Sequence, residues 1–130
     1  MEVVVLEKPI QNQKDHPYLD WIKSGKKTFE GRLMTKIKEW NLVIGKKIKF
    51  YDQNDQSSFV IVEITSLPTF ADFGEAFDVL GEKLIPARSK EEVIYMYNEL
   101  FHYPDEIPVK NQPSKMIQDH GVVTIGFKIV

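Results

Sequence analysis

Apolar residues recur at every second position in several short segments of the chain, a period that is typical of β-strands. The pattern predicts a first strand that starts at residue 2 and ends before Pro9, and a last strand over residues 120–130. Residues 46–52 and 57–67 also alternate, and the polar sequence QNDQ lies between them. These two segments therefore predict a hairpin.

A helix followed directly by a strand is predicted in the first quarter of the chain. Residues 15–25 have Pro17 in the position of a first helical turn and Gly25 where a left-handed residue would end the helix. The period then changes from helical to alternating over residues 26–34. This segment predicts a strand with one polar face.

Two further helices are predicted in the second half of the chain. Residues 69–81 have helical spacing, with Thr69 as the candidate cap. The next helix begins at Ser89, and Glu92 follows three residues later, which is the spacing of a capping box. Three prolines then predict an irregular loop over residues 102–114.

The order of these elements indicates an α+β fold. Helices are embedded in a mixed, mostly antiparallel set of strands, and the last strand returns to the early ones to form a small β-barrel flanked by helices. We find no internal repeat or linker and expect one domain over residues 1–130. Residues 104–118 are the segment that we expect to be most mobile.

Composition restricts the class of protein. A chain of 130 residues, 42% of them hydrophobic, can bury one core but is too short for two domains. The chain has no cysteine, which excludes disulfides, thiol nucleophiles and thiolate zinc sites. The apolar run near the N-terminus is too short for a signal peptide or a membrane span. We therefore expect an intracellular protein of the cytoplasm, with the nucleus as the alternative, and no membrane partner.

Charge is segregated along the chain, although the net charge is only -2. Residues 23–49 contain two acidic residues and nine basic ones, whereas residues 50–130 contain six basic residues and 13 acidic ones. The basic residues of the first segment are Lys23, Lys26, Lys27, Arg32, Lys36, Lys38, Lys46, Lys47 and Lys49. Such a chain can present one positive face to a phosphate backbone while the remainder stays acidic. The alternative is a set of solvated lysines without a ligand.

The common signatures of metal and cofactor sites are missing from the sequence. His16, His102 and His120 are far apart, without a second ligand at helical spacing, so we expect no metal. There is no phosphate loop of the Walker type, no dinucleotide fingerprint and no nucleophile elbow. We therefore expect no cofactor.

The pattern G-x-K-x-x-E-x-R is formed by Gly25, Lys27, Glu30 and Arg32. This pattern resembles the signature of the ASCH domain family, which is related to the PUA fold. The segment YLDWIKSGKKTFEGRL resembles the helix, turn and strand of that family, and HGVVTIGFKIV is similar to its closing strand. The resemblance implies a small β-barrel with flanking helices, the fold that the strand and helix order also indicates.

The resemblance also implies a cleft that receives RNA, a nucleotide or a nucleoside. Its ligand-binding residues would be Gly25, Lys26, Lys27, Glu30 and Arg32. Gly25 would end the helix so that the two lysines project at the mouth of the barrel and meet phosphate. Arg32 shares a strand face with Glu30 and could pair with it or hold an anion. The alternative without a ligand is an ion pair on an exposed strand.

An enzymatic function is the first alternative. Some small bacterial members of the family are amidohydrolases that remove the acetyl group from 4-acetylcytidine, and the resemblance assigns their catalytic lysine to Lys27. Glu30 stands where their threonine would fall, Thr28 is a weak substitute, and their later glutamate matches either Glu75 or Glu82. Lys27 and Glu30 would then be the catalytic pair, transferring protons to a bound water.

A protein-interaction module is the second alternative, because larger coactivator proteins contain domains of this family. Exposed apolar side chains at Phe101, Tyr103 and Ile107 would favour this function. A deep basic cleft would disfavour it.

Overall fold

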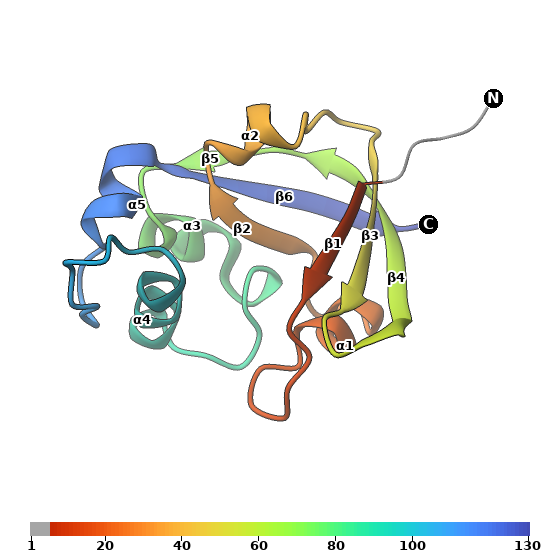
Figure 1. Cartoon of the computed structure of the whole chain (residues 1–130), viewed down its shortest axis with the longest axis horizontal. Coiled ribbons are helices and arrows are strands. Elements are labelled where there is room, and N and C mark those ends of the chain that lie inside the picture. Colours follow the sequence, from red (N-terminus) through yellow and green to blue (C-terminus); the bar gives the residue numbers. More distant parts are fainter. Residues whose placement is uncertain (1–5) are drawn as a thin grey trace.

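The computed structural model describes residues 6–130 and contains one curled sheet (Figure 1). The strands are β1 (Leu6–Ile10), β2 (Phe29–Leu33), β3 (Lys47–Asp52), β4 (Asp55–Ser66), β5 (Thr69–Phe70) and β6 (Val122–Ile129). Their order is β1-β3-β4-β6-β2, and β5 also pairs with β6. The β1–β3 pair is parallel and the other pairs are antiparallel. The α+β class and the mixed, mostly antiparallel barrel-like sheet are therefore confirmed.

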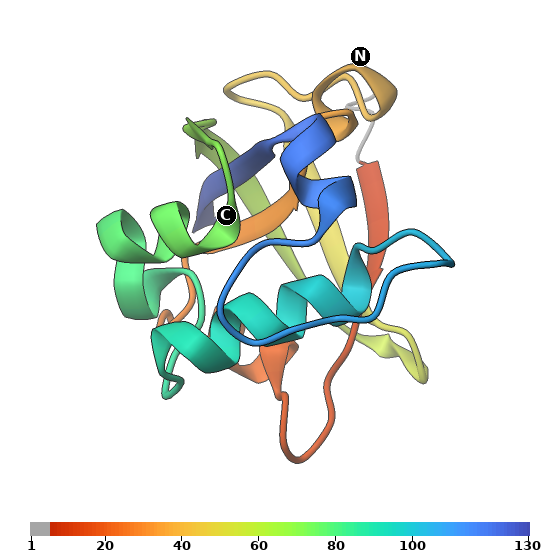
Figure 2. The same ribbon diagram turned by 90° about the vertical axis from the view of Figure 1, so that its left-hand side faces the viewer.

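Helices cover one side of this sheet and both of its ends. They are α1 (Tyr18–Lys23), α2 (Lys36–Glu39), α3 (Phe73–Leu80), α4 (Lys90–Leu100) and α5 (Lys115–His120), with a 3₁₀ turn η1 (Gly81–Lys83) after α3. In Figure 1, α3, α4 and α5 lie together on one side, while α1 and α2 lie at opposite ends of the sheet. Figure 2 shows α4 across the front of the molecule, with the segment that joins α4 to α5 alongside it. Among residues 6–130, no helix has the length and apolar character needed to cross a membrane.

Two hydrophobic cores lie on opposite faces of β6. Inside the curl, Leu19 and Ile22 of α1 pack against a core that includes Phe50 of β3. On the other face, a second core includes Phe73 of α3 and Val93 of α4. Residues 122–127 of β6 are buried without interruption, because this strand separates the two cores. The last strand is thus central to the fold.

The sheet stays open between its two outer strands. β1 and β2 are the first and last strands of the sheet order, and within residues 6–130 no pairing joins them. The register places Lys8 beside the buried Phe50 and Glu30 beside the buried Ile125. Phe50 and Ile125 both belong to the core inside the curl. Lys8 of β1 and Glu30 of β2 therefore lie on the inner faces of the half-barrel, at its open seam.

Several local predictions are confirmed. β3 and β4 form the predicted hairpin. Gly25 has a φ of +80°, the left-handed conformation that ends the first helix. The hydroxyl of Ser89 accepts a hydrogen bond from the backbone of Glu92, and the carboxylate of Glu92 accepts one from the backbone of Ser89. Each of these features depends on a few neighbouring residues.

Three local predictions are wrong. β1 continues through Pro9, because an edge strand has an unpaired side on which a missing N–H is tolerated. Asp72 rather than Thr69 caps α3, since Thr69 pairs with β6 and is held in an extended conformation. Pro17 precedes the first turn of α1 instead of lying within it. The part of the predicted first strand before Leu6 lies outside the described residues.

The predicted mobile segment contains a helix and is tied to α4. Asn98 of α4 is buried, and its amide donates hydrogen bonds to the carbonyl oxygens of Val109 and Gln112. It also accepts one from the backbone N–H of Ser114, which in turn caps α5. Residues 102–114 are irregular as predicted, whereas α5 was not predicted from the sequence.

Candidate functional site

A pocket of about 260 Å³ lies at the open seam between β1 and β2. Its wall includes Ile10, Tyr18, Glu30, Arg32, Tyr97 and Phe101. These residues come from both edge strands, from α1 and from α4 with the residue that follows it. The pocket therefore exists because the half-barrel is not closed by a β1–β2 pair.

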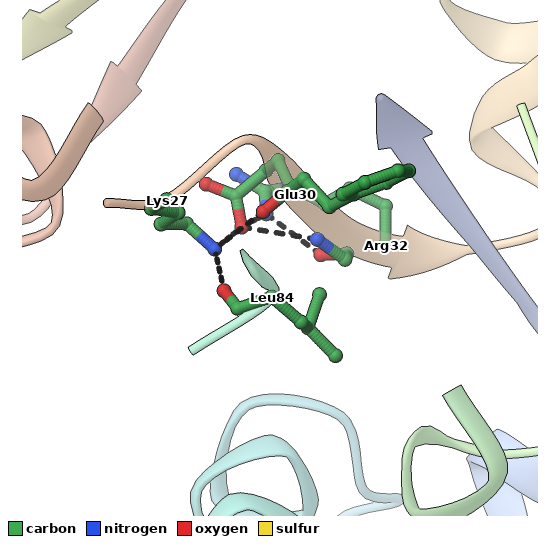
Figure 3. A network of polar contacts seen from close by, with 6 residues as sticks. Lys27, Glu30, Arg32 and Leu84 are labelled. Atoms are coloured by element: carbon green, nitrogen blue, oxygen red, sulfur yellow. Dashed lines mark hydrogen bonds and ion pairs between the residues drawn. The ribbon is translucent and has the colours of Figure 1, made fainter. Parts of the chain in front are cut away.

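One oxygen of Glu30 gathers the polar groups of the site (Figure 3). Its Oε1 lies 3.1 Å from Nη1 of Arg32 and 3.6 Å from Nζ of Lys27. The same oxygen accepts a hydrogen bond of 3.1 Å from the backbone N–H of Gly31. Among residues 6–130, no side chain or backbone group forms a hydrogen bond with Oε2 of Glu30. One oxygen of a carboxylate that is only 5% exposed is thus left for a ligand.

Lys27 does not project into solvent, and this part of the prediction is wrong. Its side chain is completely buried. Nζ donates hydrogen bonds to the carbonyl oxygen of Phe29, at 2.7 Å, and to that of Leu84. With Glu30 nearby, the three N–H groups of the ammonium are engaged inside the protein. Lys27 therefore joins β2 to the segment after η1 and orients Glu30.

Gly31 is required by packing rather than by a ligand. A Cβ atom at this position would lie 2.6 Å from Cε1 of Phe73 and 2.8 Å from the hydroxyl oxygen of Tyr97. The Phe73 and Tyr97 rings stack with centroids 3.6 Å apart. Because Gly31 has no side chain, α3 and α4 can approach β2 closely at this position. The glycine between Glu30 and Arg32 is thus fixed by contacts with α3 and α4, which the spacing of the signature does not reveal.

The ionisable groups of the site influence one another's pKa. Burial raises the pKa of the Glu30 carboxyl, but Lys27, Arg32 and the Gly31 N–H outweigh burial and leave it below its ordinary value of 4.5. Burial lowers the pKa of the Lys27 ammonium below 10.5, and Glu30 opposes this effect. Burial and the charge of Glu30 raise the pKa of Tyr18. At neutral pH the site contains a carboxylate and a neutral phenol.

The hydroxyl of Tyr97 is buried and has no hydrogen-bond partner within the described part of the chain. Burial, followed by the charge of Glu30, raises the pKa of this phenol well above 10. A buried hydroxyl without a partner costs about 1–3 kcal/mol, so such groups commonly bind water or a ligand. Tyr97 therefore lines the pocket with its side chain, while its hydroxyl is buried beside Gly31.

The structure brings together only part of the predicted site. Glu30 and Arg32 line the pocket, and Lys27 lies behind them. Gly25 and Lys26 are exposed and are not part of the pocket wall. Tyr18 and Tyr97 were missed, because aromatic residues on the apolar face of a helix look like ordinary core residues in a sequence. No three His, Asp or Glu side chains gather as metal ligands in residues 6–130.

No protein-family model matches the chain, and no curated protein sequence matches it. Solved structures do match. The crystal structure of an ASCH domain from Lactobacillus crispatus superposes with a TM-score of 0.52 at 18% identity, covering 95% of this chain and 79% of that one. The chain has an ASCH-like fold.

Two further solved structures match this chain over almost their whole length. The crystal structure of hypothetical protein PH0355 gives a TM-score of 0.70 at 24% identity and covers 98% of this chain and 100% of that one. The solution structure of protein PF0455 from Pyrococcus furiosus gives a TM-score of 0.67 at 24% identity, with 98% of both chains covered. The fold that the resemblance implies rests on the match to the ASCH domain structure.

Proposed function

We propose that the seam pocket binds a nucleobase, either in single-stranded RNA or in a free nucleotide or nucleoside. The observation that carries the proposal is the carboxylate of Glu30, which lines the pocket with Arg32 and whose Oε2 forms no hydrogen bond within residues 6–130. A carboxylate accepts hydrogen bonds from the amino and ring N–H groups of a base, while a guanidinium donates to its carbonyl oxygens. Glu30 and Arg32 therefore suit the hydrogen-bonding edge of a base.

The size and lining of the pocket support the same ligand class. A volume of about 260 Å³ is near the lower end for small-molecule sites, which suits one base or nucleoside rather than a longer segment. Tyr18 and Phe101 add aromatic surface to the wall. Proteins that bind unpaired bases commonly combine such surfaces with a few polar groups at the base edge.

Hydrolysis of an amide, as in 4-acetylcytidine, is the alternative function. The 3.6 Å separation between Lys27 and Glu30 favours it, because a coupled pair of this kind can transfer protons. The lowered pKa of Glu30 argues against it, since a more acidic carboxyl group is a weaker base. The buried Lys27 also spends two of its hydrogens on backbone carbonyls. We therefore favour binding.

A protein-interaction function has less support. Phe101 is half-buried and stacks on Phe73, and the hydroxyl of Tyr103 donates a hydrogen bond to Asp119. Of the three apolar residues that would favour this function, Ile107 is the strongly exposed one, at 87%. One exposed isoleucine is ordinary for a protein surface.

The binding proposal is tested by calorimetric titration with the four ribonucleosides and with short single-stranded RNA homopolymers. We expect at least one of these ligands to bind, and Glu30→Gln to weaken binding by about tenfold, because a charge-assisted hydrogen bond is lost. Lys26→Gln is the control at an exposed signature position and should leave affinity for nucleosides unchanged. Lack of binding by every ligand, or equal binding by Glu30→Gln, would refute the proposal.

The alternative is tested by incubating 4-acetylcytidine with the parent protein and with Glu30→Gln. We expect no release of acetate from either protein. Turnover by the parent protein that Glu30→Gln abolishes would assign the amidohydrolase function instead. Circular dichroism of both proteins establishes that the substitution leaves the fold intact.

A further inference from the structure

Three cationic side chains surround the ring of Trp40, which follows α2 directly. Nζ of Lys8 lies 4.3 Å from the ring centroid, Nζ of Lys36 lies 5.2 Å from it, and Cζ of Arg32 lies 5.6 Å from it. The three cations come from β1, β2 and α2, so the tertiary structure assembles the cluster. We call Lys8, Arg32, Lys36 and Trp40 the cationic cluster.

The cationic cluster is adjacent to the pocket along the same open seam. β1 and β2 run in opposite directions, because one parallel pair and three antiparallel pairs connect them across the sheet. Ile10 and Glu30 both line the pocket. Lys8 precedes Ile10 by two residues, and Arg32 follows Glu30 by two residues, so both side chains lie one step further toward α2. Arg32 belongs to the pocket wall and to the cluster at once.

Positive charge in the cationic cluster exceeds the negative charge beside it. Lys36 pairs with Glu39 at 2.9 Å, and Arg32 shares Glu30 with the buried Lys27. Lys8 has no ion-pair partner among residues 6–130. Three cations held around one aromatic ring repel one another, and an anion bound between them would relieve this repulsion.

Another lysine adds to the positive potential. Nζ of Lys46 donates hydrogen bonds to the carbonyl oxygens of Trp40, at 2.7 Å, and of Asn41, at 3.2 Å. This contact holds the residue after α2, and with it the indole ring, against the rest of the protein. The ring that carries the cations is therefore anchored.

We infer that the cationic cluster binds the phosphate group of a nucleotide whose base occupies the seam pocket. This inference rests on the proposed function, which it extends from a base to a phosphorylated ligand. The negative Glu30 at the pocket end suits the amino groups of a base and repels phosphate, whereas the cationic end attracts phosphate. The two ends thus give the ligand one orientation, with Arg32 between base and phosphate.

The inference is tested by comparing each ribonucleoside with its 5′- and 3′-monophosphates in calorimetric titrations at low salt. We expect one monophosphate of the bound nucleoside to bind at least about tenfold more tightly than the nucleoside itself. Lys8→Gln and Lys36→Gln should each remove a large part of this gain without changing nucleoside affinity. Lys38→Gln is the matched control, because Lys38 is an exposed lysine of the same helix outside the cluster.

A second measurement separates the inference from the proposed function. Pyrophosphate, which has no base, is titrated against ¹⁵N-labelled protein while the indole N–H signal of Trp40 is followed. A shift that Lys8→Gln suppresses and Lys38→Gln preserves supports the phosphate site even if no nucleoside binds. If a nucleoside binds but its monophosphates bind no more tightly, and pyrophosphate leaves the Trp40 signal unchanged, the phosphate site is refuted while the base pocket stands.

Discussion

Replacing Lys27 with methionine should lower the free energy of unfolding by about 3 kcal/mol, although lysines usually lie on protein surfaces and contribute little to stability. Methionine has a similar length and keeps much of the apolar contact, so the change isolates the ammonium group. Lys27 is completely buried, and its ammonium donates to the carbonyl oxygens of Phe29 and Leu84 and lies 3.6 Å from Glu30. All three interactions are lost together.

The size of this loss in free energy depends on the interactions that Glu30 keeps when the Lys27 ammonium is removed. Removing one partner of a buried ion pair typically costs about 3–5 kcal/mol, because the other charge remains buried without compensation. Glu30 keeps Arg32 and the N–H of Gly31, which places the expected cost at the lower end of that range. A loss of about 3 kcal/mol is a large share of the 5–15 kcal/mol that typically stabilises a domain.

Urea denaturation, followed by circular dichroism, measures this loss as a shift of the midpoint at unchanged slope. Lys26→Met changes the exposed neighbouring lysine and should alter the free energy of unfolding by less than about 0.5 kcal/mol. The double variant Lys27→Met with Glu30→Gln should be less destabilised than the sum of the two single variants, because neither charge is then left unpaired. A loss below about 1 kcal/mol for Lys27→Met, or strict additivity in the double variant, would show that the buried pair is not the source of stability.

Three further predictions follow from the same contacts. Because the pKa of Glu30 is below 4.5 in the folded protein, its ionised form contributes stability that is present above pH 4.5 and lost as pH falls through the folded-state pKa. In acid titrations, the free energy of unfolding of Glu30→Gln should therefore depend less on pH than that of the parent protein. Equal pH dependence of the two proteins would contradict this prediction. Gly31→Ala should cost about 1–3 kcal/mol in thermal or urea unfolding, because its Cβ overlaps the stacked rings of Phe73 and Tyr97, and a neutral effect would mean that the rings move aside easily. The basic segment over residues 23–49 could contact three or four phosphates of single-stranded RNA. In that case, a plot of the logarithm of the binding constant against the logarithm of salt concentration should have a slope of about -2 to -3. Binding that does not depend on salt would show that this segment does not contact the phosphates.

Local sequence was sufficient to predict most of the elements and the residues of the signature. The hairpin, the capping box at Ser89 and the left-handed Gly25 each depend on neighbours within a few positions, so their signals are contained in the sequence. Caps and strand ends that depend on distant partners were predicted wrongly. Thr69 is extended because β6 pairs with it, and Pro9 is tolerated because β1 is an edge strand.

Burial and long-range contact decided the roles of the signature residues. The alternating pattern correctly put Glu30 and Arg32 on one face of a strand, but it could not show that this face turns into an open seam. The position of Lys27 in the signature does not show whether its side chain projects at the mouth of a barrel or is buried. It is buried, and its ammonium donates a hydrogen bond to the carbonyl oxygen of Leu84, 57 residues away in the sequence.

The aromatic and cationic parts of the site also come from separate regions of the chain. Tyr97 of α4 packs against Gly31 of β2. Lys8 and Lys36 come close to each other because both lie near the ring of Trp40. The sequence by itself determined which side chains are available and which secondary structures carry them, because those depend on local backbone preferences and periodicity. Only the tertiary structure decided which of them share a pocket, because the curl of the sheet and its unpaired edges result from contacts between residues far apart in the chain.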